Sequence, residues 1–523
     1  MSHSRPATSR TAADRCPGVL RLTEAADGFL ARIRLPGGLI TADQLRVLAR
    51  LASELGDGRA ELTSRGNVQL RGLAADAGAL LTGELTAAGL LPSLEHDRVR
   101  NILASPLAGL DGGRDLTSLI RALDAELCAR PRLAELPGRF LFAIDDGRGD
   151  VAGLGADVTA VSGDGIFILN GLAVPAAPPA GSRAPGGGPD SGNGPVSTCT
   201  HEIVTAMLAW AEAFLDERAA HGGSAWRIAD LPDGPARIRD TVAERLGLAT
   251  LPGESASAGP FRSESRASAR PVGLVRRGEE GGAGETGRSV RDDIALGEVI
   301  GAVLVAPLGR LAAPQLSWLA DRAGEARVTP WRSVVLPGLA DAAGVLREAD
   351  ALGFGVDASS PWLRVTACAG RPGCASALAD VQADAATFAQ RWPGRVVHVS
   401  GCARHCGRPA ATEIDVTATS EGYEVVRLHP GRRGNLQALV RHDQGRGRPG
   451  PVSPGRGAGR RADDPLLRDD RPAGFRRPQP GCRARRACGL AARSAGAVRR
   501  ADGGLGDHPA AAPRFQRDCL HAR

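Results

Sequence analysis

Four cysteines carry the clearest chemical signal in the chain. Cys368 and Cys374 flank five residues in CAGRPGC, and Cys402 and Cys406 flank three residues in GCARHCG. Four thiolates can bind a zinc ion or an iron–sulfur cluster. Zinc sites usually pair cysteines across roughly two to four residues. The wider first pair and the Gly- and Arg-rich loops therefore favour a [4Fe–4S] cluster at these four cysteines.

A second group of polar side chains lies in LTSRGNVQLRGL, residues 62–73. Its apolar and polar residues alternate, which predicts a half-buried strand whose polar side chains share one face. Arginine recognises carboxylates in a planar, bidentate manner, so such a face suits an anionic ligand in a cleft. A solvated sheet face is the alternative. The candidates on this strand are Arg65, Asn67, Gln69 and Arg71, and weaker candidates elsewhere are Arg100, Asn101, Arg139 and Arg332.

The elements around this strand outline one α+β unit. FLARIRL, residues 29–35, predicts a strand that ends in a Pro-Gly-Gly turn. Thr41 can cap the following helix, whose leucines at 45, 48, 51 and 55 fall on one face, and Gly56 can end it. The strand at 62–73 and a second helix near 76–88 follow. This β-α-β-α order is typical of a ferredoxin-like α+β sandwich.

The same unit recurs about 270 residues later, a period far too long for a solenoid repeat. VIGAVLVAPLGRLAAPQLSWL, from residue 299, is similar to the segment that begins at Phe29. The matching pairs are Pro36 and Pro307, Gly38 and Gly309, Gln44 and Gln315, and Leu45 and Leu316. The repeat predicts two pseudo-symmetric half-domains, with chance similarity as the alternative.

Charge and composition exclude several classes of protein. All 65 basic residues are arginine, which indicates codon bias from a GC-rich genome. Residues 427–523 hold 22 Arg, eight Asp and no Glu, so the basic character belongs to this tail. The rest is mildly acidic, and we expect no nucleic-acid partner. No run approaches 18 apolar residues and no apolar leader opens the chain, so neither membrane association nor secretion is expected. Ten sparse cysteines indicate a reducing cytoplasm.

Taken together, these motifs resemble the sulfite and nitrite reductase superfamily. Within it, the chain is most similar to the precorrin-3B synthases of aerobic cobalamin biosynthesis. The resemblance covers roughly residues 16–426. It is carried by the cysteine loops and by LTSRGNVQLRGL (62–73), RNILASPLAGLD (100–111) and VTPWRSVVLPGL (328–339). It implies an α+β fold with two pseudo-symmetric ferredoxin-like half-domains and a C-terminal iron–sulfur/siroheme-type reductase domain.

The resemblance and the changes in composition predict a division of the chain. Its parts are a disordered start (1–15), a first ferredoxin-like half-domain (16–98), a first copy of a tetrapyrrole/cluster-type α+β domain (99–175), linkers around a helix near 200–219 (176–295), a second half-domain (296–358), a [4Fe–4S]-binding domain (359–429), and a tail rich in Arg, Gly and Pro (430–523). For the tail, out-of-frame translation is favoured over disorder and over RNA binding.

The resemblance also implies an activity. A precorrin-3B synthase hydroxylates precorrin-3A and forms a γ-lactone, using O2 and an electron donor that is NADH or a reductase or ferredoxin. The family is associated with an additional mononuclear iron, for which the sequence offers no clear triad of histidine and carboxylate ligands. No catalytic residue is assigned.

One departure helps to choose among the alternatives. Siroheme-dependent reductases keep basic residues on the strand after a Leu-Pro turn, where they bind sulfite or nitrite. Here LPGRFLFAID offers Arg139 but has Leu141 at the second basic position. This difference favours the synthase, and siroheme is expected only if the chain is a sulfite or nitrite reductase. A zinc-containing RNA-binding or structural protein is the non-catalytic alternative.

Overall fold

The computed structural model describes residues 16–111, 113–163, 165–175, 198–251, 272–276, 299–409 and 411–428. The predictions for residues 1–15, for the Gly/Pro/Ser-rich parts of 176–295 and for the tail at 430–523 lie outside these residues. The fold is α+β, as predicted, with four sheets and helices that pack on them. None of the helices in the described ranges is both long enough and apolar enough to span a membrane.

The first half-domain contains the predicted β-α-β-α unit. Its sheet and helices comprise β1 (Thr23–Ala25), β2 (Gly28–Ile33), β4 (Arg59–Leu62), β5 (Val68–Leu73), α1 (Ala42–Leu55) and α2 (Gly78–Ala87). α1 begins where predicted because Thr41 and Gln44 form a capping box. The Thr41 hydroxyl accepts from the Gln44 amide at 3.2 Å, and the Gln44 side chain accepts from the Thr41 amide at 3.0 Å.

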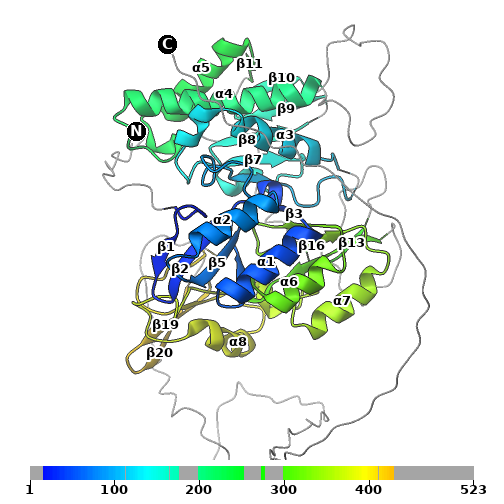
Figure 1. Cartoon of the computed structure of the whole chain (residues 1–523), viewed down its shortest axis with the longest axis vertical. Coiled ribbons are helices and arrows are strands. Elements are labelled where there is room, and N and C mark those ends of the chain that lie inside the picture. Colours follow the sequence, from blue (N-terminus) through cyan, green and yellow to red (C-terminus); the bar gives the residue numbers. More distant parts are fainter. Residues whose placement is uncertain are drawn as a thin grey trace, which may run out of the picture. The chain divides into compact units, whose positions relative to one another are not determined.

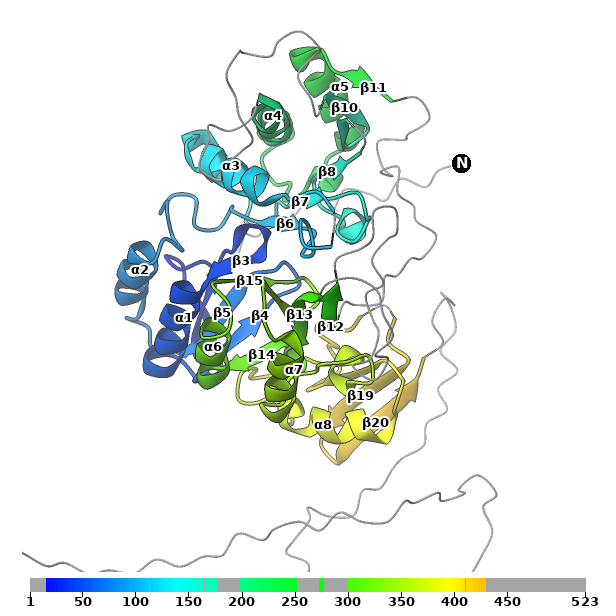
Figure 2. The same ribbon diagram turned by 90° about the vertical axis from the view of Figure 1, so that its right-hand side faces the viewer.

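The second half-domain repeats this arrangement. Its elements are β12 (Gly273–Arg276), β13 (Val299–Val305), β15 (Glu325–Val328), β16 (Ser333–Pro337), α6 (Ala313–Ala320) and α7 (Ala342–Ala351). The two halves also exchange a short strand. β3 (Leu39–Thr41) pairs with β15 of the second half, and β14 (Arg310–Ala312) pairs with β4 of the first (Figure 2). The predicted pseudo-symmetry is thus confirmed.

The repeat extends to single hydrogen bonds. The Gln44 side chain donates to the Ala88 carbonyl at 3.0 Å, and Gln315 donates to the Leu352 carbonyl at the same distance. Thr63 and Thr329 each close a turn by accepting two backbone amides on their hydroxyl oxygen. In both turns the fourth residue has a positive φ, 64° at Gly66 and 62° at Arg332. The second copy therefore accepts a strained, non-glycine residue there.

The two half-domains share one hydrophobic core. α1 and α6 lie side by side (Figure 1), and their buried leucines pack with the inner faces of both sheets. Leu48 on α1 and Leu319 on α6 are both fully buried. Replacing one such leucine by alanine typically costs about 2–5 kcal/mol. This core holds the two sheets as one body and leaves their outer faces free for other contacts.

A third sheet follows in the chain. It contains β6 (Ile102–Ala104), β7 (Phe142–Asp145), β8 (Val158–Ser162), β9 (Ile166–Leu169), β10 (Leu172–Pro175) and β11 (Ala249–Thr250). Its helices are α3 (Thr117–Cys128), α4 (Thr198–Ala220) and α5 (Gly234–Leu246). α4 was predicted, whereas α5 was not. Pro235 in its first turn and the left-handed Gly247 at its end are start and stop signals that could have located it.

The fourth sheet carries the cysteine loops. It contains β17 (Val365–Ala367), β18 (Val397–Ser400), β19 (Ile414–Thr419) and β20 (Gly422–Arg427), with α8 (Val381–Arg391). α8 begins at Val381 because the Asp380 side chain caps it at the Ala383 amide, while the Leu378 amide donates to the Gly401 carbonyl at 2.7 Å. β17–β20 repeat the order of β6–β9, with two parallel pairs and then an antiparallel one.

Short 3-10 turns complete the described chain. They are η1 (Pro36–Gly38), η2 (Pro131–Glu135), η3 (Ala152–Leu154), η4 (Ile228–Asp230), η5 (Pro307–Gly309) and η6 (Pro361–Leu363). η1 and η5 are equivalent turns of the two half-domains. At each of them a glycine follows at positive φ, 73° at Gly38 and 76° at Gly309.

Candidate active site and cysteine loops

The two cysteine pairs lie on loops that follow neighbouring parallel strands. Cys368 follows β17 and bonds through its amide to the Val399 carbonyl of β18 at 3.0 Å. The Gly401 amide, at the end of β18, donates to the Cys368 sulfur at 3.1 Å. Because parallel strands end at the same edge of a sheet, the second pair, Cys402 and Cys406, starts beside the first.

The four cysteine sulfurs are spaced more widely than the ligands of one zinc ion would be. Within the described chain, the one set of three metal-ligating atoms closer than 4.8 Å to one another is formed by Asp145, Asp146 and Asp150. No three of the four sulfurs are therefore that close together. A zinc ion bound at about 2.3 Å to each sulfur would need closer spacing. A four-iron cluster is larger, and sulfur ligands on Gly-rich loops with free amides suit it.

Arg71 connects β5 to the first cysteine loop. Its guanidinium forms a bidentate pair with Asp27, at 3.0 and 2.9 Å, and also donates to the Gly373 carbonyl at 2.9 Å. Gly373 directly precedes Cys374. The side chains of Arg71 and Asp27 are only 8% and 14% exposed. The arginine that we predicted to face a ligand therefore also holds the loop of a thiolate.

A polar row crosses the outer face of the first sheet. Arg32, Gln69, Glu61 and Arg310 are register partners on β2, β5, β4 and β14. Arg32 donates to the Gln69 side-chain oxygen at 2.9 Å, and Gln69 donates to Glu61 at 3.0 Å. Arg310 lies 3.5 Å from Glu61. Because register partners lie on one face, this row places its charges beside Arg71 and the cysteine loops.

One end of this row opens into a cavity of about 370 Å³. Its lining residues are Cys16, Pro17, Arg32, Arg65 and Arg139. Burial lowers the pKa of the Arg32 and Arg65 guanidinium groups, and the positive charge of Arg227 lowers that of Arg65 further. Arg32 and Arg65 are half-buried, whereas Arg139 is exposed, and three guanidinium groups around one space favour a bound anion. The cavity has the size and charge of a site for one or two carboxylates.

A chain of asparagine contacts holds this cavity together. The Asn67 side-chain oxygen accepts from the Leu35 amide at 2.9 Å, and its nitrogen donates to Asn101 at 3.3 Å. Asn101 in turn donates to the Gly138 carbonyl at 3.0 Å, where Arg65 also donates at 3.4 Å. The turn that carries Arg65 and the residue before Arg139 are thus fixed to each other.

Comparison with known proteins gives this geometry a context. The model of the nitrite/sulfite reductase ferredoxin-like half domain matches residues 21–88. A precorrin-3B synthase of Sinorhizobium sp is 27% identical over 426 residues, covering 79% of this chain and 82% of that protein. A ferredoxin–nitrite reductase of Synechococcus elongatus is 27% identical over 421 residues, covering 74% and 75%. These similarities support a relation to the nitrite and sulfite reductase superfamily.

A solved structure shares the fold. The Mycobacterium tuberculosis NirA protein superposes with a TM-score of 0.54 at 20% identity, over 79% of this chain and 76% of that one. Matches over shorter segments have higher sequence identity. The ferredoxin–nitrite reductase of Zea mays is 45% identical, but over only 87 residues and 16% of this chain. The superfamily relation therefore extends over most of the described residues, and sequence identity is concentrated in part of them.

The polar residues predicted to bind a ligand occupy different positions in the structure. Arg65 and Arg139 meet in the cavity, and Gln69 and Arg71 share the outer face of β5. Asn67 is 1% exposed and bonds to backbone and to Asn101, so it positions the site rather than facing a ligand. Asn67 and Arg65 belong to the turn before β5, where the alternation of the strand has not yet begun.

Arg100 and Arg332 lie apart from this cavity. Arg100 is 3% exposed, binds Asp124 through two bonds of 2.7 Å and donates to the Leu90 carbonyl at 3.0 Å. It therefore stabilises the packing of α3. The Arg332 side chain covers Gly309, where an added Cβ would come within 2.5 Å of its Cδ. Burial lowers the pKa of Arg332, and the charge of Glu61 opposes that shift.

Two arginines in and just after β2 were missed by sequence reasoning. Arg32 lines the cavity, and Arg34 is 2% exposed and donates to the carbonyls of Pro17 and Arg98. The signal was present in FLARIRL, where the two arginines alternate with apolar residues as a half-buried strand requires. β2 and β5 are adjacent, so their polar faces coincide.

The second half-domain replaces most of this polar row with apolar residues. Val303 and Val335 occupy the positions equivalent to Arg32 and Gln69, because they are register partners on β13 and β16. Both valines are buried in a small cluster with Leu107 and Val275. Of the two related faces, one carries a polar row and borders a cavity. The other is largely apolar, and its Arg327 on β15, the register partner of Val335, is buried and donates to the carbonyls of Pro106 and Ala108.

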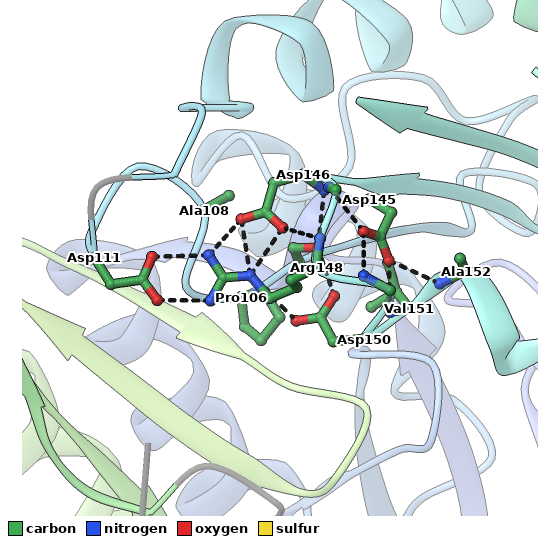
Figure 3. Close-up of polar contacts among 12 residues, drawn as sticks. Pro106, Ala108, Asp111, Asp145, Asp146, Arg148, Asp150, Val151 and Ala152 are labelled. Atoms are coloured by element: carbon green, nitrogen blue, oxygen red, sulfur yellow. Dashed lines mark hydrogen bonds and ion pairs between the residues drawn. The ribbon is translucent and has the colours of Figure 1, made fainter. Parts of the chain in front are cut away.

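The third sheet places a different group where the fourth has cysteines. Its loops after β6 and β7 meet in an ion-pair cluster, in which Arg148 lies between the carboxylates of Asp111, Asp146 and Asp150 (Figure 3). Arg148 binds Asp111 through two bonds of 2.7 and 2.8 Å. The equivalent position in the first copy is thus filled by a salt-bridge network of this chain's own residues.

This carboxylate cluster does not fit the additional iron. The two carboxylate oxygens of Asp145 already accept hydrogen bonds from four backbone amides, those of Gly147, Gly149, Val151 and Ala152. Arg148 neutralises the neighbouring carboxylates. An iron site of the oxygenase type would use two histidines and one carboxylate. No such group lies within the described residues, and no residues are assigned to a second iron.

Proposed function

We propose that this chain is a precorrin-3B synthase, an oxidoreductase that hydroxylates precorrin-3A and closes a γ-lactone. The Sinorhizobium relative bears this name and matches over most of its length. In this reaction one oxygen atom of O2 enters the substrate and the other leaves as water. The reductant supplies the two electrons and two protons that form the water. NADH, or a reductase or ferredoxin, is the proposed electron donor.

The observation that carries the proposal is the arginine cavity at the end of the polar row on β2 and β5. Precorrin-3A is a macrocycle that bears many carboxylates, and Arg32, Arg65 and Arg139 converge on a space that suits one or two of them. Arginine binds carboxylates more strongly than neutral donors do, with roughly 1.5–3 kcal/mol per charge-assisted bond. The cavity would hold the rim of the macrocycle and leave the ring to extend along the polar row of β2 and β5.

Position 141 supports the synthase over the reductase. Leu141 is 4% exposed and packs with Leu103 and Ala143 in a small apolar cluster. Its side chain therefore supplies no positive charge to a bound sulfite or nitrite. A small oxyanion depends on several cations that surround it, whereas the carboxylates of a large substrate can each use one arginine.

Cys368, Cys374, Cys402 and Cys406 are the proposed ligands of a [4Fe–4S] cluster. When bound, such a cluster supplies single electrons to a neighbouring substrate site. Arg71 would hold the loop of Cys374 against β5. Siroheme belongs only to the alternative function, in which the macrocycle would be the resident group rather than the substrate.

Turnover assays on anaerobically reconstituted protein test the proposal. The protein should consume O2 and reductant only when precorrin-3A is present, and should release precorrin-3B, identified by mass spectrometry. It should reduce sulfite and nitrite at negligible rates with a viologen donor. Tightly bound siroheme together with rapid turnover of sulfite or nitrite, and no conversion of precorrin-3A, would assign the chain to the reductases. Stoichiometric zinc without sulfide would exclude both enzymes.

A further inference from the structure

The loop after α4 brings an aromatic ring onto one of the cavity arginines. The guanidinium carbon of Arg139 lies 4.5 Å from the centroid of the Trp226 ring. Arg139 also lines the cavity with Arg32 and Arg65. A guanidinium stacked on a ring has one face covered, while its N–H groups lie in its plane and stay available at the edges. The ring therefore restricts the orientation of Arg139 without occupying its hydrogen-bond donors.

A buried carboxylate binds the backbone close to both Arg139 and Trp226. Asp157, whose side chain is 2% exposed, accepts the Leu141 amide at 3.0 Å and the Ile228 amide at 2.9 Å. The Arg227 side chain also pairs with it, at 2.5 Å. Leu141 lies two residues after Arg139, and Arg227 directly follows Trp226. One carboxylate thus fixes the backbone segment that follows Arg139 and the segment that follows Trp226.

The same loop adds positive charge to the site. The charge of Arg227 lowers the pKa of Arg65, as the largest cause after burial, although Asp157 opposes this effect. The residues that line the cavity include three arginines and no carboxylate. The loop therefore orients Arg139 through Trp226 and adds the positive charge of Arg227 near the cavity. The side chain of Leu141, just before β7, adds no positive charge.

We propose that Trp226 is a positioning residue that fixes the plane of Arg139 so that its edge presents two parallel N–H groups to a substrate carboxylate. This inference rests on the proposed function and names the residue that adapts the cavity to a carboxylate of a large ligand. A planar, bidentate edge matches a carboxylate in geometry, and an arginine that is free to rotate must lose that freedom on binding.

Two substitutions and a matched control test the role of Trp226. Trp226→Leu removes the aromatic face and keeps apolar bulk, and Trp226→Phe restores a smaller ring. Trp318→Leu is the control, because Arg322 stacks on Trp318 at 5.3 Å on α6, outside the cavity lining. The probe is uroporphyrin, a stable fluorescent tetrapyrrole polycarboxylate, titrated into each protein at fixed ionic strength.

Trp226→Leu should weaken uroporphyrin binding about two- to fivefold, the effect of losing an exposed cation–π contact. Trp226→Phe should recover most of the affinity, and Trp318→Leu should bind like the wild type. Equal affinities for Trp226→Leu and Trp318→Leu would overturn the inference, as would a Trp226→Phe variant no better than Trp226→Leu.

A second measurement needs no tetrapyrrole. Phenylglyoxal modifies accessible guanidinium groups, and peptide mass spectrometry gives the rate at Arg139. The rate should rise several-fold in Trp226→Leu and stay unchanged in Trp318→Leu. If the wild type fails to bind uroporphyrin, the proposed function is wrong, and the modification rates alone decide whether Trp226 positions Arg139. An unchanged rate in Trp226→Leu would then refute the positioning role.

Discussion

Arg71 and Gly373 lie 302 residues apart in the chain, and the Arg71 guanidinium donates to the Gly373 carbonyl at 2.9 Å. This bond joins the polar strand of the first half-domain to the loop that carries Cys374. Sequence reasoning assigned Arg71 to ligand binding, and the structure adds a contact with the proposed cluster loop. Substitution of Arg71 should therefore affect the cysteine site as well as any bound substrate.

Arg71→Ala should lower the free energy of unfolding and speed loss of the cluster. Removing one partner of a buried ion pair costs about 3–5 kcal/mol, because Asp27 is left unpaired. Asp27→Asn separates the two effects, since it weakens the ion pair but keeps the bond to Gly373. Chemical denaturation and the decay of visible absorbance under a chelator give the two readouts. Equal cluster decay in both variants would show that the Gly373 bond does not hold the loop.

Replacing any one of the four clustered cysteines should abolish the iron–sulfur cluster. Cys374→Ser removes a thiolate and should reduce iron and acid-labile sulfide together. Cys128→Ser is the control, because burial raises the pKa of Cys128 to about 11 and keeps it a neutral thiol at the end of α3. Loss of iron in Cys128→Ser, or retention of full iron and sulfide in Cys374→Ser, would contradict the assignment.

Arg65→Ala should weaken precorrin-3A binding about tenfold or more, since roughly 1.4 kcal/mol corresponds to one decade. The fold should persist, because the side chain of Arg65 makes only a long bond of 3.4 Å to Gly138. Arg59→Ala, on the exposed side of β4, is the matched control for loss of one positive charge. Fluorescence titration at two salt concentrations measures both. Indistinguishable affinities for the two variants would remove Arg65 from the site.

The cluster around Arg148 should make stability depend on pH. Burial, and the charges of Asp145 and Asp146, raise the pKa of Asp150 to about 7 despite its 2.5 Å bond from Ser105. The native state therefore holds this proton more tightly than the unfolded chain. Stability from this group is complete below about pH 4 and is lost as the pH rises to about 7.

Asp150→Asn should remove this dependence. The variant should be more stable than the wild type at pH 8, by at most about 4 kcal/mol, and similar to it at pH 4. Asp43→Asn, whose carboxylate is 94% exposed, serves as the control and should change little at either pH. Thermal denaturation across this range measures the difference. A wild type whose stability rises from pH 4 to pH 8 relative to Asp150→Asn would contradict the shift.

Much of this protein could be predicted from local sequence patterns. The spacing of the four cysteines and the capping signals around α1 are short-range features, and short-range physics determines them. The alternation at 62–73 predicted one strand, whereas a turn closed by Thr63 separates β4 from β5. The repeat of Pro36, Gln44 and their counterparts was also sufficient to predict two half-domains. These patterns specify which elements form and which residue types could do chemistry.

Only the tertiary structure decided what those residues contact. Arg32 and Val303 occupy equivalent strands, yet one borders a cavity and the other is covered by Leu107 and Val275. The sequence pattern does not say which face a distant segment will cover, because strand pairing and loop docking join residues hundreds of positions apart. For the same reason Arg100 stayed a weaker candidate for ligand binding until Asp124 was seen beside it. Side-chain chemistry is local, whereas burial and pairing are properties of the folded chain.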